Sequence, residues 1–214
     1  METRKRSSIK LTGGPHGIPR AVVHEVQRGR LLDAMADVIA EEGYLSTTVH
    51  KVLTRARISR RTYYELFKDK EDCFLVAYDE IAEQAIETAK AACREEADAS
   101  PERRIEAGVR SILELTEREP NVARMFIVEV LAAGNAAREQ RSRTMERLSE
   151  MVASALVERG DDRPEAVLHA RVLIGGVHEL VYDSLVRGRV ENLTEVAGEI
   201  VASYLSPPGA VHGR

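Results

Sequence analysis

The chain contains no tryptophan, and aromatic residues make up only 4% of its 214 positions. An apolar core must therefore be built mainly from Ala, Val, Leu and Ile, which dominate the 43% of residues that are hydrophobic. No apolar run approaches the ~18–20 residues that a membrane span requires. The basic N-terminus has no apolar stretch behind it, which excludes a typical secretion signal. We expect a cytoplasmic protein without a membrane partner.

Cysteine is equally scarce, with Cys73 and Cys93 as its two occurrences. Both lie on one predicted helix, where a rise of ~1.5 Å per residue places them ~30 Å apart. This separation excludes a disulfide between them. We expect reduced thiols in the core, as is typical of intracellular proteins.

Sequence motifs of the common enzyme classes are absent. The chain has no HExxH, GxSxG, P-loop or GxGxxG pattern, and none of its six histidines are spaced i, i+4. The pair Asp161-Asp162 could hold a metal ion, but a capping turn before Pro164 accounts for it. We expect no catalytic activity, no cofactor and no metal site.

Charge is divided unevenly along the chain, although the formal net charge is only −4. Residues 1–70 carry 14 Lys and Arg against 8 Asp and Glu, a net charge of +6. The remainder carries 17 basic against 27 acidic residues, a net charge of −10. This division favours a protein that places one end on a polyanion such as DNA and keeps the other end away.

Residues 46–70 have the pattern of two short helices joined by a tight turn, followed by the start of a third helix. Ser46 or Thr47 can cap the first helix, and Ser59 can cap the second, which extends over residues 60–67. The apolar positions recur at helical spacing and would face inward. They are Val49, Val52, Leu53, Ala56, Tyr63 and Phe67.

This pattern is typical of a helix-turn-helix, in which the second helix enters the major groove of DNA. Arg60 and Arg61 lie in its first turn, where the guanidinium fork can reach the O6/N7 edge of guanine. Hydroxyl groups and Lys70 can contact phosphates. The expected DNA-binding residues are Thr48, His50, Ser59, Arg60, Arg61, Thr62, Tyr64 and Lys70. The alternative is an ordinary helical hairpin with a solvated basic face.

The same stretch resembles the DNA-binding domain of the tetracycline-repressor (TetR) family of bacterial transcription regulators over residues 28–78. The matching residues are Gly43-Tyr44, Thr47-Thr48-Val49, Ile58-Ser59, Thr62-Tyr63-Tyr64, Phe67 and Lys70-Glu71. One departure is Arg57, where the family usually has glycine in the turn. A residue with a side chain is strained at positive φ, so either the turn differs here or Arg57 accepts the strain and adds a phosphate contact.

The periodicity predicts an all-α fold of about nine helices and no strand. We expect a basic arm at residues 1–20, a DNA-binding domain at 21–68, a helical ligand-binding and dimerisation domain at 69–206, and a loose tail at 207–214. Arg4-Lys5-Arg6 in the arm could reach a phosphate backbone or minor groove; the alternative is a leader that only adds solubility. A helix over residues 69–97 would form a rigid rod leading out of the DNA-binding domain. A strongly apolar helix is predicted over residues 121–133.

The resemblance implies a homodimer that binds a palindromic operator and is released by a small molecule. Repression rather than activation is likewise implied only by the family. The last two helices, over residues 164–186 and 193–205, would pair the subunits, and Gly175-Gly176 would permit close approach. The expected interface residues are Leu173, Gly175, Gly176, Val177, Leu180, Val196, Ile200 and Tyr204. The alternative is that these helices bury their apolar faces only within the subunit.

A pocket for the effector would lie among the buried helices that carry flexible or polar-tipped side chains. The candidates are Met125, Phe126, Leu148, Met151, His178 and Tyr182. Methionines adapt to irregular ligands, and the low aromatic content argues against an aromatic cage for a cation, which favours a hydrophobic or amphipathic effector. For each candidate the alternative is plain core packing. For the whole protein the alternative is a helical protein–protein interaction module that does not bind specific DNA.

Overall fold

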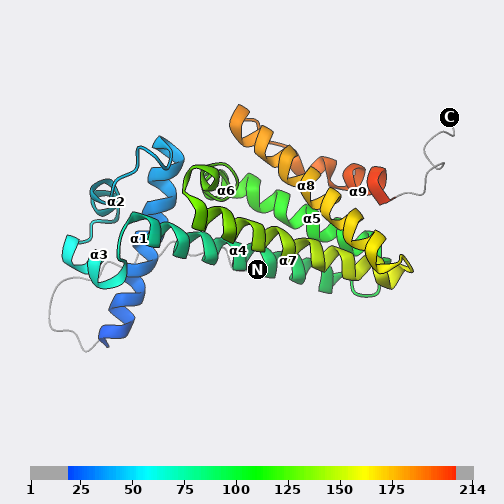
Figure 1. Cartoon of the computed structure of the whole chain (residues 1–214), viewed down its shortest axis with the longest axis horizontal. Helices are drawn as coiled ribbons and strands as arrows, with labels where there is room; N and C mark the ends of the chain where they lie inside the picture. The colour runs from blue at the N-terminus through cyan, green and yellow to red at the C-terminus, as the bar shows by residue number, and fades with distance from the viewer. Residues whose placement is uncertain (1–18, 206–214) are drawn as a thin grey trace.

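The computed structural model describes residues 19–205, which form helices joined by short loops and contain no strand (Figure 1). The basic arm and the tail expected beyond these residues lie outside the described part of the chain. The described elements are α1 (Arg20–Glu42), α2 (Val49–Ala56), α3 (Arg60–Leu66), α4 (Lys70–Glu95), α5 (Pro101–Arg118), α6 (Pro120–Ile127), η1 (Glu129–Ala132), α7 (Asn135–Arg159), α8 (Arg163–Arg187), η2 (Leu193–Val196) and α9 (Ala197–Leu205). The all-α prediction is confirmed.

The molecule is elongated, with α1, α2 and α3 grouped at one end (Figure 1). The 26-residue helix α4 leads from this group along the length of the molecule, beside α5 and α7. Helix α8 packs along α7, and α9 packs against α5. A rod of this length spans ~39 Å, so it connects the predicted DNA-binding end rigidly to the distal helices.

Local capping sets where the helices begin. Five helices begin after a side chain that accepts the N–H of the residue three positions later; the capping residues are Thr48, Ser59, Asp69, Ser100 and Asp162. The first short helix therefore begins after Thr48, and our assignment of its cap to Ser46 or Thr47 was wrong. Thr47 is buried, and its hydroxyl donates to the carbonyl of Gly43 at 2.8 Å.

The apolar segment predicted as one helix over residues 121–133 is divided in two. Helix α6 ends at Ile127, and the chain tightens into the 3-10 helix η1. The division brings the carboxylate of Glu129 to the backbone N–H of Tyr44, 2.9 Å away in the α1–α2 loop. A local sequence pattern cannot predict this contact, because its two residues are 85 positions apart in the sequence.

A single hydrophobic cluster extends through the described chain, from Leu31 in α1 to Leu205 in α9. Helix α1 packs on both α4 and α6, and Arg28 of α1 forms an ion pair with Glu80 of α4. The domain boundary predicted at residue 68 therefore falls within one continuous hydrophobic core. A movement of the distal helices can therefore be transmitted to α1 through packed side chains.

Candidate nucleic-acid interface and ligand cavity

Helix α3 is held by one buried side chain and turns its remaining side chains outward. Tyr63 is fully buried, and its hydroxyl donates to the carbonyl of Asp69 at 2.8 Å. Burial raises the pKa of Tyr63 well above its ordinary value. Arg60 is exposed on the opposite side, as are the side chains of Arg61 (88%) and Tyr64 (53%). The helix therefore presents its first turn to solvent.

The hydroxyl groups expected to contact DNA hold the starts of the two short helices. Ser59 Oγ accepts the N–H of Thr62 at 3.1 Å and lies 2.9 Å from Thr62 Oγ1. Thr48 Oγ1 accepts the N–H of Lys51 at 3.3 Å. His50 is exposed in the first turn of α2. Capping positions these groups at the outer surface and leaves a hydroxyl proton of the Ser59–Thr62 pair available to a phosphate.

Two basic residues of α2 are neutralised within the chain. Lys51 pairs with Glu42, while Arg55 pairs with Glu41 and lies 3.6 Å from Asp37. The hydrogen bond from Arg55 lowers the pKa of the Glu41 carboxyl. The positive charges of Lys51 and Arg55 are therefore balanced by carboxylates of α1.

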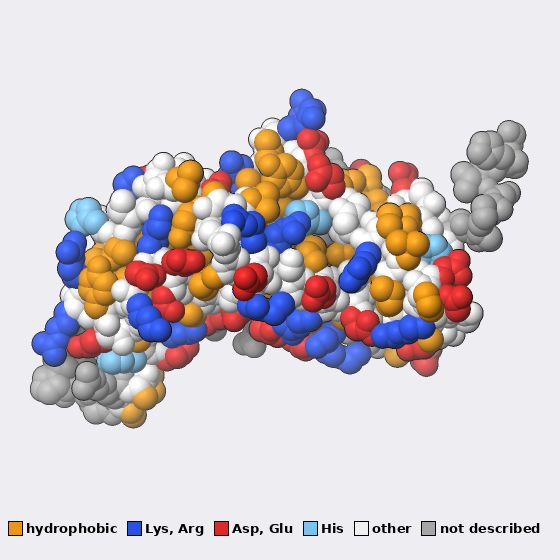
Figure 2. Space-filling model, in the orientation of Figure 1, with side chains coloured by type: hydrophobic (Ala, Val, Ile, Leu, Met, Phe, Trp, Pro, Cys, Tyr) orange, Lys and Arg blue, Asp and Glu red, His pale blue; other side chains and the backbone are white. Residues whose placement is uncertain are grey.

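The basic residues around the turn are not neutralised in this way. Within residues 19–205, Arg57 and Arg60 have no carboxylate partner, and Arg61 pairs only with Glu65 on its own helix, at 3.0 Å. Figure 2 shows basic side chains at this end of the molecule. The positive charge available to a polyanion is thus concentrated where α2 meets α3.

Arg57 occupies the turn in the left-handed conformation, with φ 54° and ψ 47°. Of the two alternatives that the sequence left open, the strained turn is the one observed. A left-handed residue with a side chain costs about 1–2 kcal/mol relative to right-handed geometry. Its side chain is exposed, three positions before α3 begins.

Lys70 lies elsewhere than its predicted role requires. Its ammonium group donates to the carbonyls of Tyr44 at 2.9 Å and Thr47 at 3.1 Å, and sits 4.0 Å above the Tyr44 ring. Burial lowers the pKa of this lysine. Because the ammonium group is engaged by the α1–α2 loop, Lys70 joins α4 to that loop in this conformation, and we no longer assign it as a free phosphate contact.

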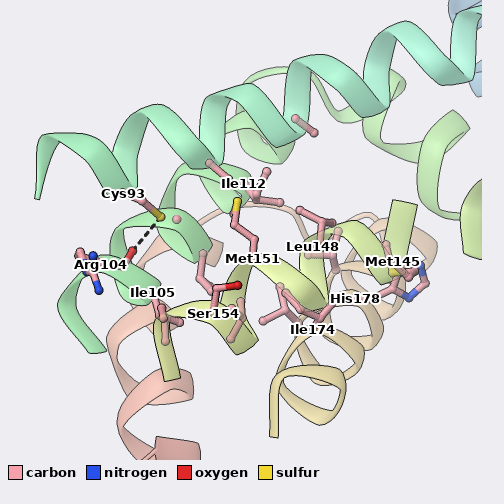
Figure 3. Close-up of a pocket in the computed structure, with 18 of the residues that line it drawn as sticks. Cys93, Arg104, Ile105, Ile112, Met145, Leu148, Met151, Ser154, Ile174 and His178 are labelled. Atoms are coloured by element: carbon pink, nitrogen blue, oxygen red, sulfur yellow. Dashed lines mark hydrogen bonds between the residues drawn. The ribbon is translucent and has the colours of Figure 1, made fainter. Parts of the chain in front are cut away.

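A cavity of about 210 Å³ lies between α4, α5, α6, α7 and α8. Its walls are predominantly aliphatic, and two methionines, Met145 and Met151, lie along α7 (Figure 3). From Met145 to Glu158 the cavity follows α7 for ~20 Å. Such a long, narrow apolar space suits an extended aliphatic chain. Its volume is below the ~300–1,000 Å³ usual for ligand pockets, so a larger occupant must displace flexible side chains.

The structure places four of the six predicted pocket residues in this wall. They are Phe126, Leu148, Met151 and His178. Met125 is fully buried in the core, and Tyr182 packs at the edge of the core; neither lines the cavity. Sequence reasoning missed the α4–α5 wall, including Ala85, Ala89 and Gly108. Because these residues have small side chains, they leave space for the cavity. The run of small residues on these helices is a signal that the sequence does contain.

Polar groups lie toward opposite ends of the cavity (Figure 3). At one end, Cys93 Sγ donates to the carbonyl of Arg104 at 3.2 Å, and Arg104 pairs with Glu158. Burial raises the pKa of the Cys93 thiol, so it remains protonated. At the other end stands His178 of α8, whose Nε2 lies 3.2 Å from a guanidinium nitrogen of Arg141.

The cavity wall connects to the α1–α2 loop through a row of four neighbouring aromatic rings. Phe126 of the wall stacks on Tyr78 with ring centroids 4.6 Å apart. Tyr78 lies 6.3 Å from Phe74, which meets Tyr44 edge-on at 5.0 Å. Beside them, Arg124 of α6 donates to the carbonyl of Leu185 at 3.1 Å. Contacts thus run without a gap from the cavity to the predicted DNA-binding end.

The predicted interface residues of α8 and α9 have several different environments. Leu173 and Val177 are buried inside the subunit, so they offer no surface to a partner. Gly175 and Gly176 are exposed, with nothing within 4 Å of a Cβ built at either position. The remaining four, Leu180, Val196, Ile200 and Tyr204, are partly buried.

The outer face of α8 carries three exposed apolar side chains, with the exposed acidic residues Glu179 and Asp183 between the second and the third. Leu168, Val172 and Val186 are exposed by 61%, 47% and 51%, and the two glycines lie between them. Figure 2 shows hydrophobic side chains on the surface over this helix. Of the α8 residues predicted for the interface, Gly175 and Gly176 lie on this exposed face, whereas Leu173 and Val177 do not. Within residues 19–205, no helix is both long and apolar enough to cross a membrane.

Residues 31–77 match the family model of bacterial regulatory proteins of the tetR family. A stretch of 70 residues is 36% identical to the fatty acid metabolism regulator protein of Bacillus subtilis (strain 168). This stretch covers 33% of the chain and 36% of that protein, so the matched region spans about a third of the relative.

The fold is similar to solved structures over most of its length. The fatty acid degradation regulator FadR from Bacillus halodurans matches with a TM-score of 0.74 at 19% identity, covering 83% of this chain and 97% of that one. The transcriptional regulator FadR from Bacillus subtilis, solved in complex with stearoyl-CoA, matches with a TM-score of 0.73 at 20% identity and the same coverage of both chains. At these identities the likeness concerns the fold.

Proposed function

Because this chain carries the N-terminal domain of the tetR family of bacterial regulatory proteins, we propose that it is a ligand-responsive transcriptional repressor that binds a palindromic operator as a homodimer. The observation that carries this proposal is the pairing of an outward-facing, arginine-tipped α3 with an apolar cavity joined to it by continuous packing. The relatives that match are regulators rather than enzymes.

Operator reading would fall to the first turn of α3. The guanidinium groups of Arg60 and Arg61 can each donate two hydrogen bonds to a guanine, and the hydroxyl of Tyr64 can contact a phosphate of the DNA backbone. Arg57 would add a phosphate contact beside them. His50 and the capping hydroxyls of α2 and α3 would fix the register on the duplex.

Homodimerisation is supported by the outer face of α8. Leu168 and Val172 are exposed apolar side chains one turn apart on the outer face of α8, and Val186 is exposed further along that face; exposed apolar patches mark interaction sites. Gly175 and Gly176 have open space above them, so the helix of a second copy could approach closely. A two-fold pair of subunits would present two α3 helices to successive half-sites, ~34–36 Å apart on one face of the duplex.

The effector would be a hydrophobic or amphipathic molecule bound in the cavity. The narrow aliphatic space along α7 supports this assignment, as does the acyl thioester held by a relative of the same fold. An occupant larger than the cavity would displace Phe126 or the neighbouring methionines. Because Phe126 stacks on Tyr78, its displacement would tilt α4 and change the separation of the two α3 helices.

The test is a selection of bound sequences from random duplex DNA, using the whole protein. We expect an enriched palindrome whose half-sites lie one or more helical turns apart, with affinity that falls steeply with salt. In the Arg61→Ala variant, base preference at one position per half-site should relax by about 1–3 kcal/mol. Failure to enrich any sequence, with salt-independent association instead, would leave the interaction-module alternative standing.

A further inference from the structure

The apolar cavity adjoins a second hollow between α7 and α8, and His178 lies at their common border. Three residues, Met145, Ile174 and His178, line both spaces. The outer hollow is far more polar and contains two arginines, Arg141 and Arg171. A molecule lying along the cavity would therefore meet a polar groove on leaving it at this end.

Arg141 is a half-buried cation without an anion to balance it. Within residues 19–205 its only hydrogen-bonding contact is with His178, at 3.2 Å, and it has no carboxylate partner. Its Nε atom is buried and makes no hydrogen bond. Buried charges are normally paired, because desolvation of a lone ion is costly. An unpaired guanidinium at the mouth of an apolar cavity is the arrangement expected of a site for an anion.

The histidine beside it is electrically neutral near pH 7. Burial, reinforced by the positive charge of Arg141, lowers the pKa of His178 to about 4. A guanidinium can only donate hydrogen bonds, so Nε2 of His178 is the acceptor and the ring proton is on Nδ1. His178 thus leaves the charge of Arg141 uncompensated.

Resting on the function proposed above, we propose that Arg141 holds the head group of the effector, and that the effector is a long-chain aliphatic carboxylate. The tail would lie along α7 in the apolar cavity, and the carboxylate would meet the guanidinium fork of Arg141 at its mouth. Arginine matches a carboxylate bidentately. Such an occupant would supply the missing counter-charge.

The rim of the groove favours a compact head group over a large polyanion. Glu146 and Glu179 also line the hollow, are exposed, and have no basic partner within residues 19–205. With Arg171 they leave the outer rim with a net charge of −1. Several phosphates placed there would be repelled, whereas a single carboxylate at the inner Arg141 would not. This distinguishes a free acid from a nucleotide-bearing thioester with the same tail.

Calorimetric titration of the whole protein with three probes tests the proposal. The probes are dodecanoate, dodecanol and dodecanoyl-CoA, which share a tail length, each used below its micelle-forming concentration. We expect dodecanoate to bind at least about tenfold more tightly than dodecanol, the lower limit for a charge-assisted hydrogen bond, and more tightly than dodecanoyl-CoA. Equal affinities for acid and alcohol would overturn the anion site. Tighter binding of the thioester would overturn the choice of a free carboxylate.

The variant Arg141→Gln should reduce dodecanoate affinity about tenfold and leave dodecanol affinity unchanged. The matched control is Arg143→Gln, an exposed position on the same helix with no partner within residues 19–205, which should change neither. Thermal unfolding without ligand should show Arg141→Gln to be at least as stable as the parent, because an unpaired charge is removed. An equal loss for both probes would reduce Arg141 to a structural role and overturn the proposal.

The binding result is independent of DNA, so the two proposals can fail separately. If dodecanoate binds through Arg141 but no duplex sequence is enriched, the site stands and the repressor function fails. If an operator is found but dodecanoate neither binds nor releases it, the repressor stands and this assignment of the effector fails.

Discussion

The carboxylate of Glu129 in η1 accepts the backbone N–H of Tyr44 in the α1–α2 loop at 2.9 Å. The same carboxylate lies 3.7 Å from Arg124, whose guanidinium also binds the carbonyl of Leu185 at the end of α8. One side chain thus joins the short helices to the two elements that border the cavity. No other charged side chain of η1 is present to replace it.

We expect Glu129→Ala to weaken this junction in two measurable ways. Loss of a largely buried charged hydrogen bond should lower the free energy of unfolding by about 1–3 kcal/mol, as read from urea titrations. Operator affinity without effector should change little, while release by effector should require more ligand. Glu139→Ala, an exposed glutamate on α7, is the control and should behave as the parent. Unchanged release would show that coupling passes through the aromatic rings instead.

Substitution of Arg57 in the turn should change stability and DNA affinity in opposite directions. Arg57→Gly relieves a left-handed residue but frees the unfolded chain, so we expect a net gain of up to about 1 kcal/mol in thermal stability. The same variant should bind every DNA sequence more weakly, with the salt slope reduced by about one. Arg57→Lys should keep the slope. A parallel fall in stability and affinity would contradict this account of the turn.

Prediction from sequence succeeded where the governing interaction is local. Ser59 caps α3 as its side-chain chemistry predicts, and Tyr63 turns inward because it lies one turn from Phe67. These features depend on neighbours within four positions. A single sequence contains that information, although the equally local cap of α2 is Thr48 and not Ser46 or Thr47 as predicted.

Prediction from sequence failed where segments distant in the chain determine the partners of a side chain. The sequence offers Lys70 to a phosphate, but two carbonyls of the α1–α2 loop accept two of the three N–H donors of its ammonium group. Leu173 and Val177 were assigned to an outer face, yet α7 and the core cover them. On a helix that is apolar on more than one side, periodicity cannot say which stripe faces inward, since that depends on what packs against it.

The environment of His178 predicts that stability depends on pH. The pKa is about 4 in the folded protein, against an ordinary 6.5, so the unfolded chain binds more protons between these values. Stability is therefore complete above pH 6.5 and falls as pH drops toward 4. Allowing for solvent screening of a half-buried group, we expect a loss of about 1–2 kcal/mol that His178→Gln abolishes.

Urea midpoints at pH 6.5 and 4.5, for the parent and for His178→Gln, measure this loss. Titration of carboxylates contributes to both proteins, so the difference between them isolates the histidine. His50→Gln, at an exposed position of α2, is the control and should follow the parent. Identical pH profiles for all three proteins would contradict a neutral, buried His178.

Filling the cavity should uncouple the effector without unfolding the protein. Ala155 lines the cavity from α7, and a leucine there would occupy part of its roughly 210 Å³. We expect Ala155→Leu to leave the free energy of unfolding unchanged or raise it by up to about 1 kcal/mol, while dodecanoate binding is lost. Ala202→Leu on the exposed side of α9 should keep binding. Retained dodecanoate affinity in Ala155→Leu would place the effector elsewhere.

The outer face of α8 gives a matched pair of variants for the dimer. Val172 lies beside Gly175 and Gly176 and is 47% exposed, whereas Val157 on α7 is 39% exposed and lies off that face. A glutamate at the centre of an apolar contact leaves a desolvated charge, so Val172→Glu should shift sedimentation from dimer to monomer. It should also abolish operator binding, because a single α3 contacts too few bases. Val157→Glu should remain dimeric and bind the operator. If both single variants are monomeric, or if both remain dimeric, the subunits pair through another face.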